Sequence, residues 1–186
     1  MRGKTNPFPS FEYALLGLLN KGPAHGYELH KHLKNTGGIG LLWGIKISNL
    51  YALLSKLEKS GFIEGEVQPG EDRPARTEFH LTEVGRKEFF DWLTRMVEHP
   101  REFRQEFMLR YYFLSQFKPE VLHETCLNQL VQCQQWLTFT RQNQEKLSER
   151  TFPFALAEFR ASQIKSMTEW LEWLIAHPPI IKSQEE

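Results

Sequence analysis

Leucines recur at helical spacing through the first sixty residues, and glycines interrupt the pattern so that three helices fit. Ser10 suits the N-cap of the first helix, which ends at a Gly-Pro pair. A second helix is predicted over about residues 25–33. The third is predicted over residues 48–60, with Ser48 as its N-cap and Gly61 as a left-handed stop.

The third predicted helix has two different faces. Polar and basic residues surround an apolar stripe that would point into a core. An inner apolar stripe with a basic, hydrogen-bonding outer face is typical of a helix that reads duplex DNA. The stripe consists of Leu50, Leu53, Leu54 and Leu57.

Two short segments of alternating residues follow and predict a strand hairpin. Residues 62–67 alternate weakly, Pro69-Gly70 suits a turn, and residues 77–81 alternate again. Thr82 suits the N-cap of a fourth helix that continues through Met96 until Pro100 stops it. Three helices, a hairpin and a further helix are the order of a winged helix-turn-helix domain.

The rest of the chain is predicted to be helical. Helices are expected to end near Phe117, to start again at Pro119, and to resume after a corner at residues 152–154. Apolar residues at heptad spacing on the last two helices predict a packing seam, and surplus tryptophans and phenylalanines off this seam favour a second chain. We therefore expect a homodimer whose contacts include Leu130, Cys133, Leu137, Ile164, Met167, Leu171 and Leu174.

The sequence thus predicts a mainly α protein with two domains. Residues 1–99 would form a winged helix-turn-helix N-terminal domain that binds DNA. Residues 100–186 would form an all-helical C-terminal domain for dimerisation and effector binding.

The charge distribution agrees with this division, although the net charge of the 186 residues is zero. Residues 1–60 hold eight lysines and arginines against three glutamates. Residues 61–81 hold two arginines against five acids. The positive charge therefore lies where the DNA-reading helix is predicted.

Several classes of protein fit poorly. The sequence has no glycine-rich phosphate loop and no hydrolase or zinc-protease motif, so we do not expect an enzyme or a cofactor. No signal peptide is apparent, and no apolar run approaches the roughly 20 residues of a membrane span. A cytoplasmic protein without membrane contact is expected.

Titratable clusters offer two further hypotheses. His25, Glu28 and His32 share one helical face, but no further ligand completes a metal site, and we expect His30 and His32 to be exposed. Cys126 and Cys133 are seven residues apart, so buried apolar packing is favoured over a redox switch.

At this point the residues resemble a known family. The ordered motifs G-P-x-H-G-Y-E-L from Gly22, L-Y-x-x-L-x-x-L-E-x-x-G-F-I from Leu50 and L-T-x-x-G from Leu81 closely resemble the PadR family of bacterial transcriptional regulators. The likeness covers residues 12–93, and the helical remainder resembles the larger PadR subfamily, in which a helical domain builds the dimer.

The resemblance implies a homodimeric repressor that binds a palindromic double-stranded operator and responds to a small-molecule effector. The third helix would enter the major groove, and a wing at residues 64–81 would lie beside it. Asparagine can pair with adenine, serine with several bases, and lysine with phosphates. The DNA-binding residues that we expect are Tyr27, Lys46, Ser48, Asn49, Tyr51, Ser55, Lys56, Arg73 and Arg76.

The wing departs from the family pattern, and the effector site is poorly marked. Glu71 and Asp72 would stand at the wing tip and repel phosphates. Trp43, in a glycine-rich loop, and Trp92 are candidate pocket residues only by the resemblance. The acidic wing keeps one alternative open, which is a winged-helix protein-interaction adaptor that does not bind DNA.

Overall fold

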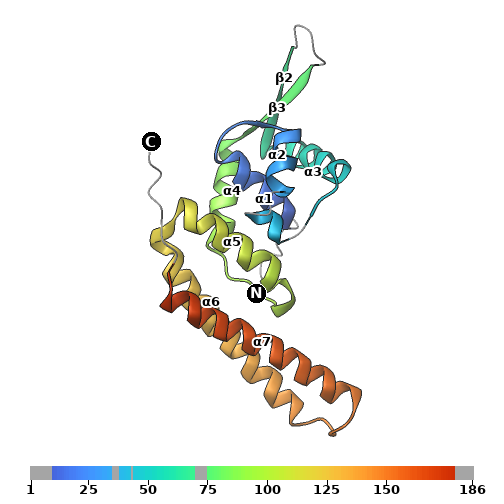
Figure 1. Cartoon of the computed structure of the whole chain (residues 1–186), viewed down its shortest axis with the longest axis vertical. Helices are drawn as coiled ribbons and strands as arrows, with labels where there is room; N and C mark the ends of the chain where they lie inside the picture. The colour runs from blue at the N-terminus through green and yellow to red at the C-terminus, as the bar shows by residue number, and fades with distance from the viewer. Residues whose placement is uncertain (1–9, 35–37, 43, 70–74, 179–186) are drawn as a thin grey trace. The chain divides into compact units, whose positions relative to one another are not determined.

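The computed structural model describes residues 10–34, 38–42, 44–69 and 75–178 (Figure 1). The chain divides into two compact units. The N-terminal unit comprises Met1–Arg95 with Met108–Phe113, and the C-terminal unit comprises Met96–Phe107 with Leu114–Glu186. The predicted mainly α fold is confirmed, with a winged helix-turn-helix in the N-terminal unit and helices alone in the described part of the C-terminal unit.

The N-terminal unit begins with the three predicted helices, which are α1 (Ser10–Leu19), α2 (Gly26–Lys34) and α3 (Ile47–Lys59). A short 3-10 turn, η1 (Ile39–Leu41), precedes α3. The predicted N-cap of α3 was wrong. Lys46 holds that position in an extended conformation without a side-chain cap, so Ser48 lies inside the first turn.

The carboxyl end of α3 follows the prediction. Gly61 has a φ of 73°. Glycine is favoured in this left-handed conformation because it carries no Cβ. Its N–H donates to the carbonyl of Glu58 at 2.9 Å, and the N–H of Phe62 donates to the carbonyl of Leu57 at 3.0 Å. This pair of bonds is a Schellman motif, which stops the helix and turns the chain into the wing.

The sheet has three strands rather than the predicted two. It pairs β1 (Ala24–His25) with β3 (Arg76–Leu81), and β3 in turn with β2 (Ile63–Gln68), all antiparallel. Ala24 lies opposite Phe79, and Ile63 lies opposite Leu81. The sequence pattern missed β1 because two residues are too few to show an alternation. Figure 1 shows β2 and β3 extending away from the helices of this unit as a hairpin.

The fourth helix, α4 (Glu83–Leu93), starts at the predicted cap. The hydroxyl of Thr82 accepts a hydrogen bond from the N–H of Gly85 at 3.0 Å. The helix ends at Leu93, so the predicted extension through Met96 was wrong. α4 contributes Trp92, whose ring stacks on that of Tyr13 at a centroid distance of 4.3 Å, to the core of the unit.

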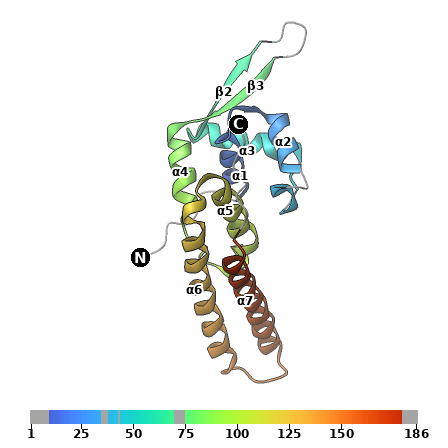
Figure 2. The same ribbon diagram turned by 60° about the vertical axis from the view of Figure 1, so that its left-hand side comes forward.

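The C-terminal unit contains a second 3-10 turn, η2 (Pro100–Glu102), and two long helices, α6 (Pro119–Gln144) and α7 (Phe152–Ala176). The helix α5 (Phe103–Phe117) contributes residues to both units. Figures 1 and 2 both show α6 and α7 side by side as a helical hairpin. Among the described residues, no helix has the length and apolar character that crossing a bilayer requires.

The predicted heptad seam lies inside this hairpin. Cys133 and Leu171 are fully buried, and Ile164 and Leu174 are 2% and 6% exposed within one chain. These predicted dimer residues therefore do not form a free surface in the structure. The seam is buried within one chain because the apolar stripes of α6 and α7 pack against each other.

Both cysteines are part of this packing. Burial raises the pKa of Cys126 and of Cys133 to about 11, so both thiols stay protonated at neutral pH. A protonated, buried thiol is a poor nucleophile. The structure therefore favours the packing hypothesis over the redox switch.

The far end of the hairpin is held by polar side chains. Arg141 on α6 forms a two-pronged ion pair with Glu158 on α7. The buried amide of Gln144 donates to the same carboxylate at 2.8 Å and accepts from Arg141 at 2.7 Å. These hydrogen bonds, with that from Arg141 first, lower the pKa of Glu158 to about 2.

The lowered pKa of Glu158 predicts that the stability of the folded chain decreases in acid. Because the pKa of Glu158 is lower in the folded chain than its ordinary 4.5, ionisation stabilises the fold above about pH 4.5. That contribution is lost as the pH falls from about 4.5 towards 2. We expect Glu158→Gln to be less stable than the unsubstituted chain at pH 7 and the difference to shrink in acid. Urea denaturation at several pH values measures it.

Glu145→Gln serves as the matched control, because Glu145 is exposed and no described residue pairs with its carboxylate. Its effect on stability should not change with pH in this range. A Glu158→Gln difference that is the same at pH 7 and pH 3 would contradict the prediction.

Candidate nucleic-acid interface

The outer face of α3 presents free polar side chains to solvent. Leu50, Leu54 and Leu57 are at most 1% exposed, and they turn the opposite face of the helix outward. Ser48, Asn49 and Ser55 lie on that outer face and are exposed. No described residue forms a hydrogen bond with their side chains. This is the arrangement that base recognition in a major groove requires.

Two tyrosines extend this surface onto α2. Tyr27 is 68% exposed, and Tyr51 is 48% exposed. The ring of Tyr51 lies against Gly26, where a Cβ would come within 2.7 Å of its Cε1. A side chain at residue 26 would therefore displace the Tyr51 ring, whose hydroxyl lies beside that helix end.

The segment that leads into α3 is fixed by a histidine that we expected to be exposed. His30 is only 8% exposed, and its Nε2 lies 3.1 Å from the carbonyl oxygen of Ile45. Ile45 is itself buried directly before the N-cap Lys46. His30 thus positions the start of α3, a role that its spacing in the sequence could not show. His32, by contrast, is exposed as predicted.

Lys56 has a different environment from the one we expected. Its Nζ lies 2.8 Å from Oε1 of Glu12, a carboxylate on α1 that is 0% exposed. Burying a carboxylate without a partner is costly, so Lys56 serves the core of the unit as well as its surface. Lys46 and Lys59 are exposed, and no described residue pairs with them.

The described part of the wing is acidic. Glu64 and Glu66 on β2 are exposed, and Glu78 on β3 accepts a hydrogen bond from Gln68 at 2.9 Å. Nε2 of His80 lies 3.3 Å from the same carboxylate. Arg76 is exposed at the start of β3, whereas Arg73, Glu71 and Asp72 lie outside the described residues. The strands thus offer phosphates little beyond Arg76.

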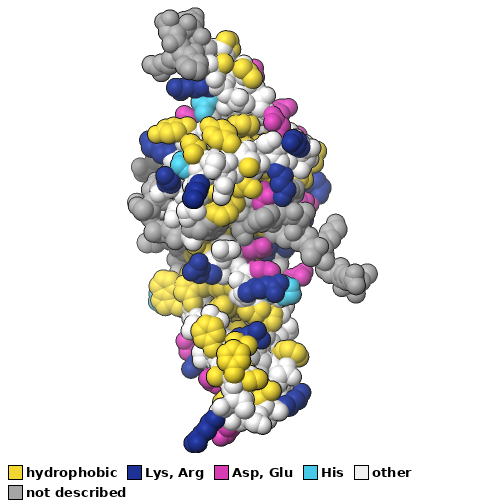
Figure 3. Space-filling view, turned by 90° about the vertical axis from the view of Figure 1, so that its right-hand side faces the viewer, with side chains coloured by type: hydrophobic (Ala, Val, Ile, Leu, Met, Phe, Trp, Pro, Cys, Tyr) yellow, Lys and Arg dark blue, Asp and Glu magenta, His cyan; other side chains and the backbone are white. Residues whose placement is uncertain are grey.

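On the face that Figure 3 shows, the basic side chains of the described residues do not gather into one dense patch. Figure 3 views the molecule from the side on which Figure 1 places α3, and lysines and arginines there are scattered among polar and apolar atoms. Few phosphate contacts and a modest salt dependence are expected of such a surface.

The structure describes one of the two predicted effector residues. Trp92 is fully buried in the N-terminal core and stacks on Tyr13. Arg110 lies over the same indole at 4.9 Å. Trp43 lies outside the described residues. The structure therefore assigns Trp92 to packing.

Comparison with known proteins decides the family. The sequence model of the transcriptional regulator PadR-like family matches residues 15–91 of this chain. The negative transcriptional regulator PadR of Bacillus subtilis (strain 168) is 30% identical over 175 residues, which cover 89% of this chain and 95% of that protein. The chain belongs to the PadR family. It is a transcriptional regulator and not an enzyme.

Several solved structures are also similar to this chain. Bacillus subtilis PadR in complex with operator DNA is 28% identical, with 90% of this chain and 98% of that chain covered and a TM-score of 0.47. The same regulator in complex with p-coumaric acid is 29% identical over the same shares, with a TM-score of 0.42. The smu.1604c protein of Streptococcus mutans UA159 is 26% identical, with 89% and 98% covered and a TM-score of 0.44.

The PadR motifs in this chain have structural roles near α3. Gly26 makes room for Tyr51, Gly61 ends α3, and Thr82 caps α4 while its hydroxyl donates to the carbonyl of Gly61 at 2.8 Å. Nδ1 of His25, in the first motif, lies 3.1 Å from the carbonyl oxygen of Thr77 and donates to it when Nδ1 carries the proton. This contact ties β1, directly before α2, to β3 of the wing. The motifs therefore fix the position of α3 relative to the sheet.

The Glu12–Lys56 pair predicts a stability defect. Lys56→Met keeps the apolar stem of the side chain and removes its charge, so Glu12 is left buried without this partner. We expect the free energy of unfolding to fall by about 2 kcal/mol. Chemical denaturation measures this loss.

Lys59→Met is the control, because Lys59 is exposed on the same helix without a described partner. It should change stability by less than about 0.5 kcal/mol. Replacing Glu12 with Gln in the Lys56→Met background should restore part of the loss. A stable Lys56→Met chain would show that the pair contributes little.

Proposed function

We propose that this PadR-family regulator is a cytoplasmic, sequence-specific DNA-binding repressor that acts as a homodimer and responds to a small-molecule effector. The observation that carries the proposal is the outer face of α3, on which Ser48 and Asn49 are exposed and free of partners. Its relative in Bacillus subtilis is a negative regulator, and that protein has been solved with operator DNA and with p-coumaric acid.

In this mechanism α3 enters the major groove with its amino-terminal end first. Asn49 and Ser48 read base edges, and Ser55 lies further along the same face. Lys46 and the hydroxyls of Tyr27 and Tyr51 bind phosphates on either side, because they are exposed at the margins of this face. Lys56 has a secondary role, since Glu12 already holds its ammonium group.

The wing contributes less to DNA binding than a wing with basic strands would. Arg76 and Arg73 are the basic residues that could meet a phosphate, while Glu64 and Glu66 oppose such a contact. DNA recognition therefore depends mainly on α3. The adaptor hypothesis is disfavoured, because the free polar face of α3 has no role in it.

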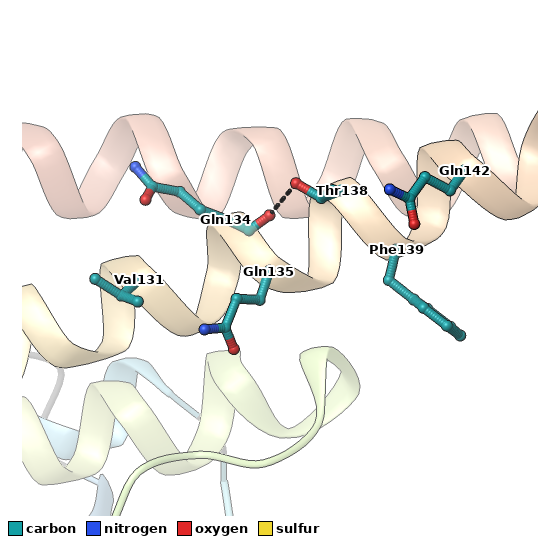
Figure 4. A pocket seen from close by; sticks show the side chains of 6 residues that line it. All are labelled: Val131, Gln134, Gln135, Thr138, Phe139 and Gln142. Atoms are coloured by element: carbon teal, nitrogen blue, oxygen red, sulfur yellow. Dashed lines mark hydrogen bonds between the residues drawn. The ribbon is translucent and has the colours of Figure 1, made fainter.

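We assign dimerisation to the outer face of α6, within the domain of residues 100–186. Residues 126–140 contain no charged residue and no histidine, and only one side of this segment packs in the hairpin. On the other side Leu127, Val131 and Phe139 are 40%, 52% and 69% exposed. Figure 4 shows Val131 and Phe139 on α6 among neutral neighbours, which are Gln134, Gln135, Thr138 and Gln142.

An uncharged helix face with large exposed apolar side chains is typical of a surface that another chain covers. A second copy related by two-fold symmetry would bring the same face against itself. Two copies of α3 would then be available for the two halves of a palindromic operator. The predicted residues Leu130 and Leu137 on α6 are partly exposed and border this face, whereas Met167 lies on α7.

Fluorescence anisotropy with the promoter region upstream of the protein's own gene tests the proposal. We expect tight binding that resists random competitor DNA and weakens as salt rises, because phosphate contacts release counterions. If random DNA displaced the protein from this promoter, and a genome-wide binding selection also found no preferred sequence, the adaptor hypothesis would be supported instead.

Asn49→Ala tests base reading. We expect a loss of about 1–3 kcal/mol on the operator and a smaller loss on random DNA, because a base contact adds sequence preference. Lys46→Ala is the control, since loss of a phosphate contact weakens both DNAs similarly and lowers the salt slope by about one. Equal losses on both DNAs for Asn49→Ala would remove it from the base-reading residues.

Val131→Glu tests the dimer surface. A carboxylate on each copy of this uncharged face would be buried in the interface, so we expect monomers in sedimentation or light scattering at concentrations where the unsubstituted chain is dimeric. Ser148→Glu adds the same charge in the exposed turn between α6 and α7 and should leave the dimer intact. A fully dimeric Val131→Glu chain would move the interface elsewhere.

A further inference from the structure

Lys56 lies on the side of α3 that we propose to meet DNA, yet its charge is directed towards the core. It follows Asn49 by seven residues, which is about two helical turns, so both residues lie on the same side of the helix. The side chain of Lys56 is 49% exposed, but its Nζ lies 2.8 Å from Oε1 of Glu12 on α1. We propose that Glu12 is a positioning residue that withholds Lys56 from DNA phosphates and so lowers the affinity for duplex DNA of any sequence.

Glu12 holds the lysine from a fixed and buried place. The side chain of Glu12 is 0% exposed, and the next residues of α1, Tyr13 and Ala14, are also fully buried. Its second oxygen, Oε2, is buried and accepts no hydrogen bond from a described residue. If the ammonium group of Lys56 moved to a phosphate, a buried carboxylate would lose this partner, which is costly. The pair therefore resists the exchange of Glu12 for a phosphate.

Stability alone does not account for this pair. The cost of removing two charges from water offsets much of their attraction, and apolar residues in place of a buried ion pair often give an equally stable fold. The place of the pair suggests a different use. Sequence-independent binding to DNA is mainly electrostatic, and a regulator meets a large excess of random sites. Holding back one lysine of α3 weakens that binding, while Ser48 and Asn49 remain available to bases.

The other lysines near α3 have different surroundings. Lys46, directly before the helix, and Lys59, in its last turn, are exposed, and no described residue pairs with them. Lys56 lies between them in the sequence and bonds to a carboxylate of the core. The restraint thus applies to the lysine that shares a side of the helix with Asn49.

This inference deepens the proposed function and rests on it, because it requires that α3 meets DNA. The two are measured on different DNA. Binding to a random-sequence duplex reports the withheld charge, whereas operator binding in the presence of random competitor reports sequence preference. The two proposals can therefore fail separately.

The salt dependence of binding to a random-sequence duplex tests the role of Glu12. Glu12→Gln keeps the shape of the side chain and removes its charge, so Lys56 is released. We expect the slope of log affinity against log salt to steepen by about 0.9, the value for one more phosphate contact. The loss of affinity between about 50 and 200 mM salt then grows about threefold. Fluorescence anisotropy with the full-length protein measures both, and a purely structural role of Glu12 would not steepen the slope.

Two further variants link the effect to Lys56. Adding Lys56→Met to Glu12→Gln should return the slope to that of the unsubstituted chain. Glu12→Met, which removes the charge with an apolar side chain of similar length, should steepen the slope as Glu12→Gln does. Circular dichroism spectra identical to that of the unsubstituted chain would show that the variants are folded.

Glu88→Gln is the matched control. Glu88 lies on α4 in the same unit and accepts hydrogen bonds from the hydroxyl of Tyr13 at 2.9 Å and from Arg95 at 3.2 Å. Its replacement raises the net charge by the same amount as Glu12→Gln but releases no lysine of α3. The slope should therefore stay at the value of the unsubstituted chain.

Four results would overturn the role of Glu12. The slope could stay unchanged in both Glu12 variants, or it could stay steep after Lys56→Met is added. Equal steepening in Glu88→Gln would assign the effect to net charge. A double variant with a slope below that of the unsubstituted chain would show that Lys56 already contacts a phosphate despite Glu12. If random competitor displaced the operator while Glu12→Gln still steepened the slope, the proposed sequence preference would fail and the role of Glu12 would stand.

Discussion

The orientation of α3, and so the face that it turns to solvent, depends on the burial of its leucines. Leu50, Leu54 and Leu57 are almost completely removed from solvent, and each contributes about 1.5–3 kcal/mol of hydrophobic free energy. A rotation of the helix about its axis would expose this stripe and bury Asn49 instead. The helix therefore has one stable orientation, and the side chains that we propose to meet DNA are those that the core leaves outside.

The surroundings of α3 then restrict its position in the other directions. Gly61 ends the helix and starts the wing, while His30 holds the carbonyl of Ile45 just before its first turn. Lys56 joins the outer face to the buried carboxylate of Glu12. These contacts act at the two ends and along one side of the helix. A base-reading element needs such rigid support because a small displacement breaks the hydrogen bonds to base edges.

The C-terminal unit divides one helix between two tasks. On its inner side α6 packs against α7 through buried cysteines and leucines, and near the hairpin end Arg141, Gln144 and Glu158 add polar contacts. On its outer side the same uncharged stretch leaves Val131 and Phe139 in solvent. One apolar face stabilises the chain, and the other is the face that we propose for dimerisation, so folding and the proposed association do not compete for the same side chains.

The amino-acid sequence by itself determined the order of the elements, the ends of α3 and α4 that glycine and threonine mark, and the inward leucines. These features are local, since helical period, capping and a left-handed glycine depend on neighbouring residues. Tertiary structure alone decided the third strand at Ala24, the pairing of Lys56 with Glu12, the burial of His30, and the partner of the heptad seam. In each case the partner is distant along the chain or the segment is too short to show a period. A stripe of apolar residues shows that a helix packs, whereas the three-dimensional arrangement determines what it packs against.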